Sequence, residues 1–379
     1  MAQTPLLRDA IGVKSITELN HRLIKSESTF NGEQFLKLAL NDLSSLGLNE
    51  RINQVKAALK ICLPSDFEKA AKVLVGALGP KLSQESLDGI DLTSPHGFIV
   101  LASCEYVASF GQESFSVSMW ALEEMTQRFS AEGAIRSFIT NHPENTFTQL
   151  KKWMTHDSVH VRRLVSEGTR PRLPLFSRLP EFVKDPSPVL NLLDQLKDDN
   201  ELYVRRSVAN NLNDIAKDNP EQVTNLLEKW SVGASKERQW LIKHALRSLL
   251  KQGNKAALSL LGFKGVNDLQ VNKFEINSQH ITLGQELEIS LNLSSESTLP
   301  NNLMIDYLVF HKKANGSLAP KVFKWTQRSL SKGKPIVLNK KHPIKKISTR
   351  KYYSGAHEIH LQVNGEILAS CDFHLQVGD

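Results

Sequence analysis

The chain has 379 residues and a net charge of +7, with 40% hydrophobic and 23% charged residues. This length exceeds one ordinary core, so we expect two or three domains, and the composition is that of a soluble globular protein. No apolar run approaches the roughly 18 residues that a membrane-spanning helix needs, and residues 1–15 lack the apolar stretch of a signal peptide. We therefore expect a cytoplasmic protein without a membrane partner.

The cysteines and histidines give no sign of a metal or cofactor site. Cys62, Cys104 and Cys371 lie far apart without metal-type spacing, as expected for reduced cysteines of a cytosolic protein. His156, Asp157 and His160 lie close together and could ligate a metal, but polar residues at a predicted helix start mostly cap the helix or contact solvent. The sequence also has no phosphate-binding glycine loop and no nucleophile elbow, so we predict neither a metal ion nor a cofactor.

The pattern is helical up to about residue 262. Residues 35–46, 51–63 and 66–78 each carry apolar residues at three- and four-residue steps, which is typical of amphipathic helices. From about Leu101 the predicted helices form pairs at intervals of roughly 35 to 45 residues, which indicates an α-solenoid of HEAT-like repeats.

One segment of this region is repeated. SVHVRRLVSEGTRPRLPL (158–175) returns as ELYVRRSVANNLNDIAKD (201–218), so that a Val-Arg-Arg triplet opens both predicted helices. A third helix, aligned from Trp240, has Leu and Ile in place of the arginine pair. We expect these second helices to line the concave face of the solenoid, where guanidinium groups match phosphate oxygens.

The resulting basic stripe predicts contacts with the DNA backbone. In the helical region the predicted contacts are Arg162, Arg163, Arg170, Arg172, Arg205, Arg206, Lys243 and Arg247. The alternative is structural, because arginines at the start of a helix also pack their stems along apolar surface and keep the charged head in water.

Two carboxylates, Glu167 and Asp214, lie within this basic pattern. A carboxylate is repelled by the polyanion that the arginines attract, so its presence needs a reason. Stabilising a cation is one such reason, and it favours an enzyme that acts on DNA. The alternative is that Asp214 caps a helix and that Glu167 pairs with Arg163 or Arg170.

After about residue 270 apolar and polar residues alternate strictly, in place of the three- and four-residue spacing of the helical region. Segments 274–295, 302–313, 321–330 and 357–377, with turn signals between them, predict about seven short strands in a small antiparallel sandwich of immunoglobulin-like size. The expected fold class is therefore multidomain α + β. We place the helical domain at 1–265 and the sandwich at 271–379.

The sandwich contains a long basic run. Thirteen Lys and Arg and no Asp or Glu lie between Lys312 and Lys351, which favours an anionic polymer as partner over a merely solvated face. Within this run we predict Lys345 and Lys346 to contact DNA.

Three stretches are similar to a known family. VRRLVSEGTRPRLPL, YVRRSVANNLNDIAKDNPE and HALRSLLKQGNKAALSLLGF resemble the AlkC branch of the AlkC/AlkD family of DNA alkylation repair glycosylases, over about residues 100–263. The resemblance implies a monofunctional glycosylase that excises 3-methyladenine and related cationic N-alkylated bases. It also implies that the lesion is contacted without a base-flipping pocket. The carboxylates carried over from the family are Glu132, Glu167 and Asp214.

The implied chemistry agrees with the residues. An N3-alkylated adenine is cationic and leaves as a neutral base, so the positive charge moves to the sugar, where a carboxylate stabilises it and orients water. The partner is then double-stranded DNA with alkylated bases, bound by a monomer. Trp120 and Trp153 are candidates, by proximity, for aromatic contacts to the lesion. The competing interpretation is a non-catalytic HEAT-repeat protein that binds DNA damage or serves as a protein scaffold.

Overall fold

The computed structural model describes residues 6–82 and 97–378. The chain divides into two compact units, one formed by residues 1–219 with 234–245 and the other by 220–233 with 246–379. In the described ranges no helix is both long and apolar enough to cross a membrane.

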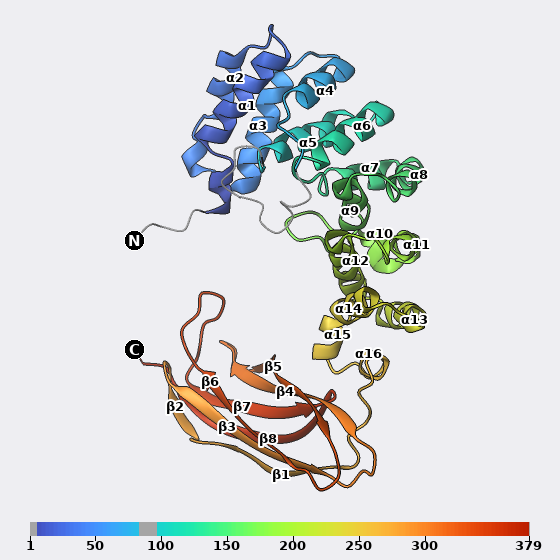
Figure 1. The fold of residues 1–379 in the computed structure, drawn as a ribbon. Coiled ribbons are helices and arrows are strands. Elements are labelled where there is room, and N and C mark those ends of the chain that lie inside the picture. Colours follow the sequence, from blue (N-terminus) through green and yellow to red (C-terminus); the bar gives the residue numbers. More distant parts are fainter. Residues whose placement is uncertain (1–5, 83–96, 379) are drawn as a thin grey trace. The chain divides into compact units, whose positions relative to one another are not determined.

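The first unit is helical, as predicted (Figure 1). The segment predicted at 35–46 ends as an α-helix at Ala39, because Asp42 adopts a left-handed conformation with φ of 45°. The helices of this unit are α1 (Val13–Ser26), α2 (Gly32–Ala39), α3 (Leu48–Cys62), α4 (Phe67–Gly76), α5 (Val100–Phe110), α6 (Phe115–Thr126), α7 (Ile135–Asn141), α8 (Pro143–Trp153), α9 (Val159–Gly168), α10 (Pro180–Lys184), α11 (Ser187–Leu196), α12 (Leu202–Ile215) and α14 (Lys236–Ala245).

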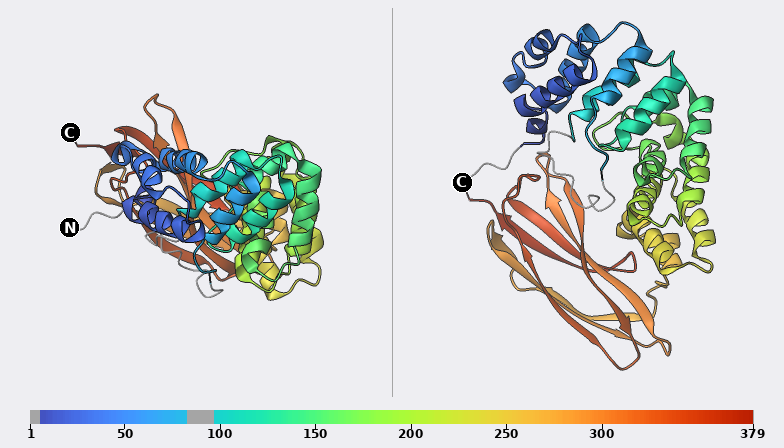
Figure 2. Two further views of the ribbon diagram at one scale, coloured as in Figure 1. Left: turned by 90° about the horizontal axis from the view of Figure 1, so that it is seen from above. Right: turned by 45° about the horizontal axis from the view of Figure 1, so that its top comes forward.

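The three aligned repeat helices form one row. α12 packs between α9 and α14, and α8 and α11 lie beside this row, with α11 in contact with both α9 and α12. The green and yellow helices of Figure 2 show the same region from two further directions. Buried aliphatic residues such as Val161, Val204 and Leu241 hold the row together. The α-solenoid of HEAT-like repeats is therefore confirmed, and the repeated helix is its regular element.

The second unit combines three helices with the strands. The helices are α13 (Pro220–Ser231), α15 (Arg247–Lys251) and α16 (Lys255–Leu260). Gly253 lies against the β-turn at Gly365, where a Cβ atom on Gly253 would be 2.7 Å from the Gly365 carbonyl oxygen. The Asn364 side chain donates to the Lys264 carbonyl at 2.8 Å. These contacts attach the last helices to the strands. The predicted division into domains at 1–265 and 271–379 stays a prediction.

The strands form two sheets, in the orders β1-β3-β6 and β2-β8-β7-β4-β5. All pairings are antiparallel except β2 with β8, which is parallel. The described residues contain eight strands where about seven were predicted, because the segment 274–295 holds three. The strands are β1 (Leu269–Ile276), β2 (His280–Thr282), β3 (Glu286–Ser295), β4 (Asn301–Lys312), β5 (Leu318–Leu330), β6 (Ile336–Pro343), β7 (Gly355–Val363) and β8 (Glu366–Gln376).

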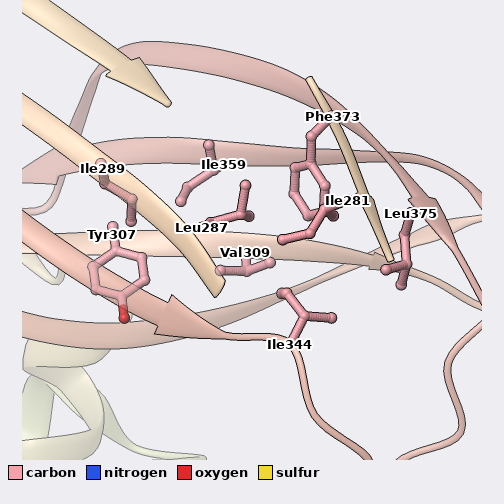
Figure 3. Packing of buried hydrophobic residues seen from close by; sticks show 9 residues of the cluster. All are labelled: Ile281, Leu287, Ile289, Tyr307, Val309, Ile344, Ile359, Phe373 and Leu375. Atoms are coloured by element: carbon pink, nitrogen blue, oxygen red, sulfur yellow. The ribbon is translucent and has the colours of Figure 1, made fainter. Parts of the chain in front are cut away.

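Alternating inward side chains from both sheets fill the sandwich. Leu287 and Ile289 of β3 pack against Tyr307, Ile359 and Phe373 of the other sheet (Figure 3). This alternation is the period-2 pattern on which the strands were predicted. The sandwich fold is therefore confirmed.

Candidate active site

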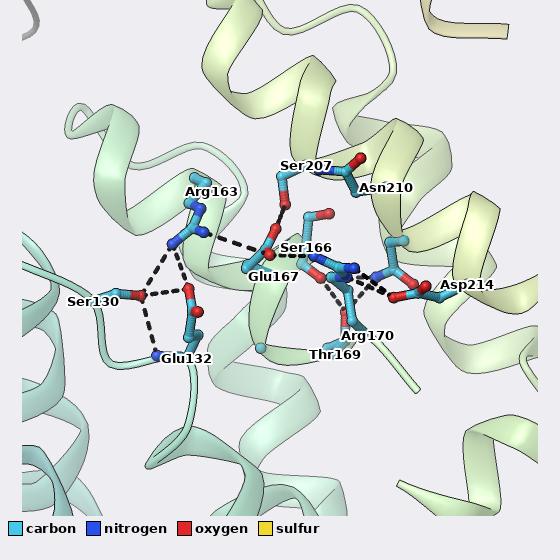
Figure 4. Close-up of polar contacts among 12 residues, drawn as sticks. Ser130, Glu132, Arg163, Ser166, Glu167, Thr169, Arg170, Ser207, Asn210 and Asp214 are labelled. Atoms are coloured by element: carbon cyan, nitrogen blue, oxygen red, sulfur yellow. Dashed lines mark hydrogen bonds and ion pairs between the residues drawn. The ribbon is translucent and has the colours of Figure 1, made fainter. Parts of the chain in front are cut away.

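Three carboxylates that are distant in the sequence converge in the helical unit (Figure 4). Glu132 lies just before α7, Glu167 in the last turn of α9 and Asp214 in the last turn of α12. Two arginines of the repeated segment, Arg163 and Arg170, join them. These three acids are the ones that the family resemblance implied as catalytic, and the fold brings all of them together.

Arg163 connects the first two acids. Its Nη1 donates to Glu132 Oε2 at 2.6 Å, and its Nη2 lies 3.5 Å from Glu167 Oε1. The Ser130 hydroxyl also donates to Glu132 Oε2, at 2.7 Å. The guanidinium therefore bridges α9 to the segment before α7.

Arg170 connects the second and third acids. Its Nη1 donates to Glu167 Oε1 at 2.5 Å, and its Nε and Nη2 both lie 2.7 Å from Asp214 Oδ2. Lys217 Nζ completes the series at 2.7 Å from Asp214 Oδ1. The result is an alternating line of three acidic and three basic groups, which we call the charge chain: Glu132, Arg163, Glu167, Arg170, Asp214 and Lys217.

Most of the charge chain is shielded from water. Glu167 and Asp214 are 5% and 2% exposed, so each carboxylate depends on its partners for stabilisation. Burial disfavours the ionised form of Glu167, but the nearby Arg163 and Arg170 guanidinium groups outweigh it, and the pKa of Glu167 falls below its usual range. Burial likewise opposes the charge of Arg170, while Glu167 and Asp214 raise its pKa. Glu167 is therefore a carboxylate at neutral pH.

A buried arginine holds the loop that carries Arg170. Arg136 of α7 is 2% exposed and donates to the carbonyls of Gly168 at 3.0 Å, Arg170 at 2.7 Å and Ser177 at 2.6 Å. Burial lowers the pKa of Arg136 to about 10. Gly168 is required here, because a Cβ atom on it would lie 2.5 Å from Cγ2 of Ile135. The SEGTRP sequence is thus fixed by α7.

Helix α12 supplies two partners that sequence reasoning missed. Ser207 Oγ donates to Glu167 Oε2 at 2.5 Å, and Asn211 Nδ2 donates to the Ser166 carbonyl at 2.7 Å. A signal existed for Ser207, since it replaces the apolar Leu164 of the first Val-Arg-Arg copy. A hydroxyl at a core-facing position of a repeat indicates that a polar contact replaces apolar packing at that position.

The two arginines of each Val-Arg-Arg triplet have different surroundings. Arg162 Nε lies 2.6 Å from Asp199 Oδ2, and Arg162 Nη1 donates to the carbonyls of His156 and Asp157. Arg205 repeats this pattern, with Nη1 donating to the Asp199 and Asn200 carbonyls. The first arginine of each triplet therefore anchors the segment before its own helix.

The remaining predicted DNA contacts are dispersed. Arg172 forms a bidentate ion pair with Asp218, at 2.7 and 2.6 Å. Arg206 is half-buried on α12, and Lys243 is exposed on α14. In the second unit, Arg247 opens α15, and the exposed pair Lys345 and Lys346 follows β6.

The two candidate tryptophans lie in different surroundings. The prediction that Trp153 contacts the lesion is wrong. This side chain is 1% exposed, and its Nε1 donates to Glu123 Oε2 at 2.6 Å, as expected for a core residue. Trp120 is 41% exposed on α6.

His156 Nδ1 accepts from the Ser158 amide at 2.9 Å, a capping contact. Across residues 6–82 and 97–378 no group of three or more His, Cys, Asp or Glu could hold a metal ion.

Known proteins resemble both parts of the chain. Residues 124–249 match the family described as "DNA alkylation repair enzyme", and residues 270–377 match "Uncharacterised protein YhaZ, C-terminal Ig-like domain". The chain is 35% identical over 372 residues to "Uncharacterized protein YhaZ" of Bacillus subtilis (strain 168), which covers 97% of this chain and 99% of that protein.

One solved structure is similar over nearly the whole chain. It is Pseudomonas fluorescens alkylpurine DNA glycosylase AlkC bound to DNA containing an abasic site analog, with a TM-score of 0.88 and 36% identity. The similarity covers 98% of this chain and 100% of that one. The helical repeats and the immunoglobulin-like strands therefore have counterparts in a single known protein.

Proposed function

Because the chain belongs to the AlkC branch of the DNA alkylation repair enzymes, with an immunoglobulin-like domain after its helical repeats, we propose that it is a DNA glycosylase. It removes cationic N-alkylated bases such as 3-methyladenine from double-stranded DNA. The observation that carries this proposal is the convergence of Glu132, Glu167 and Asp214 on two shared arginines.

The reaction is a hydrolysis at the sugar carbon that bears the base. The bond between that carbon and the alkylated base breaks, and its electron pair leaves with the base, which becomes neutral. Positive charge develops on the sugar, and a nearby buried carboxylate stabilises that charge more strongly than it would in water. Water then bonds to the same carbon and loses its proton to a carboxylate or to solvent.

The arginines make this possible by keeping buried carboxylates ionised. Glu167 Oε1 faces both Arg170 and Arg163, while Oε2 accepts from Ser207 and keeps a second lone pair for a water or a cation. No proton donor to the base is needed, because a cationic base leaves unassisted. Neutral lesions should accordingly be released much more slowly.

The direct test is release of bases from methylated DNA. The full chain is incubated with alkylated duplex DNA, and the released bases are separated by chromatography. Appearance of free 3-methyladenine supports the glycosylase. Tight, lesion-dependent binding without any released base would instead favour the non-catalytic damage-binding protein.

A further inference from the structure

A pocket of about 220 Å³ opens beside one end of the charge chain. It lies within the helical unit, where α3, α5, α9 and α12 contribute Ile52, Leu101, Arg163 and Tyr203 to its lining. Glu132 is also part of this lining. The pocket therefore shares Glu132 with the proposed active site, whereas Glu167 and Asp214 are not among its lining residues.

Aromatic rings make up much of the pocket wall. Phe98, Phe129, Phe176 and Tyr203 all line it, and the first two pack with ring centroids 4.7 Å apart. The Arg163 guanidinium lies over the Tyr203 ring, 5.3 Å from its centroid. Aromatic and guanidinium surfaces of this kind favour a flat, conjugated ligand, and they stack on every nucleobase with little regard to its identity.

The polar end of the pocket offers a hydrogen-bond acceptor. Glu132 Oε2 already accepts from Arg163 Nη1 and from the Ser130 hydroxyl. Among the described residues, Glu132 Oε1 accepts no hydrogen bond. A carboxylate oxygen that is left over at the edge of an aromatic pocket suits the N–H groups of a nitrogen heterocycle.

Part of the pocket lining is a strained segment, Leu175 and Phe176. Leu175 has φ of 70°, a left-handed conformation that leucine rarely adopts, and its side chain is 70% exposed. The next residue, Phe176, covers Gly133 so closely that a Cβ atom there would lie 2.2 Å from the ring. Strain of this kind persists where the surrounding structure requires it, often at a ligand site.

From these observations we propose that the pocket binds a planar nucleobase, namely the alkylated base after its release from DNA. An apolar cavity of about 150 Å³ holds a benzene ring, so the larger volume here suits a substituted purine or pyrimidine ring. The origin of the ligand rests on the proposed glycosylase function. The pocket itself, with its rings and free acceptor, stands on the structure alone.

The first test measures binding of the free base, so that it does not depend on catalysis. The full chain is titrated with free 3-methyladenine, and the dissociation constant is measured by ligand-observed NMR or calorimetry. We expect saturable binding to the unaltered chain and about 10-fold weaker binding by Phe176→Ala, the scale of one lost stacking contact. Leu175→Asn should also weaken binding, since asparagine tolerates the left-handed backbone but removes the apolar rim.

Two further variants distinguish the loss of a pocket contact from misfolding of the protein. Val13→Asn alters an exposed apolar residue of α1 that does not line the pocket and should bind the base like the unaltered chain. Gly133→Ala should displace the Phe176 ring by adding one methyl group and weaken binding while the protein stays folded. Equal affinity for the base in Phe176→Ala, Leu175→Asn and Gly133→Ala would overturn the proposal.

The second test separates a released base from one still attached to DNA. For Phe176→Ala, inhibition of excision by added free base should need about 10-fold more base, a larger change than any change in the single-turnover rate. A single-turnover rate that falls as far as the inhibition weakens would show that the pocket acts before release, which would overturn the assignment to the released base. If the chain binds the free base but excises nothing, the proposed function fails while the pocket assignment stands.

Discussion

Arg170 donates from Nε to Asp214 Oδ2 at 2.7 Å, with Nη2 also 2.7 Å from that oxygen, and it donates from Nη1 to Glu167 Oε1 at 2.5 Å. One guanidinium thus serves two carboxylates from different helices. All three side chains are buried or nearly so. Removing the shared cation takes one charged partner from each acid and leaves Glu167 with Arg163 and Asp214 with Lys217. Removing either acid leaves the cation with the other acid.

The first prediction concerns this shared cation. Arg170→Ala should lower the free energy of unfolding by about 2 kcal/mol or more, since two buried carboxylates each lose a charged hydrogen-bond donor. Denaturant unfolding measures the effect. Arg172→Ala removes an arginine from a pair at the surface and should cost less than about 1 kcal/mol. Equal losses for the two variants would contradict a special role of Arg170.

The second prediction concerns catalysis by the acids. Asp214→Asn and Glu167→Gln should each slow base excision by about 100-fold or more, the scale for losing one well-placed charge. DNA affinity should hold or rise slightly, because a negative charge is lost from a DNA-binding face. Asp218→Asn, four residues from Asp214 and outside the charge chain, is the matched control and should excise normally. Full activity in both active-site variants would remove these acids from the mechanism.

The third prediction separates phosphate contacts from structural arginines. Arg206→Ala and Lys243→Ala should weaken binding to every DNA sequence and flatten the salt dependence by about one unit of slope for each true contact. Arg162→Ala and Arg205→Ala should instead lower the unfolding temperature, because these side chains bind Asp199 and the carbonyls before their helices. If the salt dependence of DNA binding changed only in Arg162→Ala and Arg205→Ala, this assignment would be reversed.

The fourth prediction concerns the basic run of the sandwich. Replacing both Lys345 and Lys346 with Glu in the full chain should weaken DNA binding and slow excision at physiological salt, with partial recovery at low salt. Substitution is preferred to truncation near Phe263, because α15 and α16 belong to the same compact unit as the strands. Lys14→Glu and Lys25→Glu on α1, made together, control for net charge. Equal binding by both double variants would mark Lys345 and Lys346 as solvated surface.

The fifth prediction follows from a buried acid in β4. Burial raises the pKa of Asp306 to about 6. Between about pH 4 and 6 the folded chain therefore holds a proton that the unfolded chain has lost, so stability falls as the pH rises through this window. Asp306→Asn should remove this loss and stabilise the protein at pH 7 by about 2 kcal/mol. Unfolding curves at pH 4, 5, 6 and 7 measure it, and an unchanged pH profile would show that Asp306 does not titrate there.

Periodicity alone was enough to predict the helical repeats and the sandwich. Apolar steps of three and four residues place Val161, Val204 and Leu241 in the same row of helices, and strict alternation fills the sandwich core. These patterns are local, and burial of one face is the strongest force acting on each element. The Asn364-Gly365 turn was predictable for the same reason, since both residues adopt the positive φ that a tight hairpin requires.

Only the tertiary structure decided how the acids are arranged. Glu167 aligns with Asn210 and not with Asp214 in the two Val-Arg-Arg copies, so the repeat by itself did not place these carboxylates together. They meet because α9 ends at Gly168 against Ile135, while α12 continues to Ile215 and carries Asp214 to Arg170. The same packing gave Arg162 and Arg163 different partners, although they are neighbours in one motif. Which charges pair depends on where helices end and cross, and no local periodicity encodes those distances.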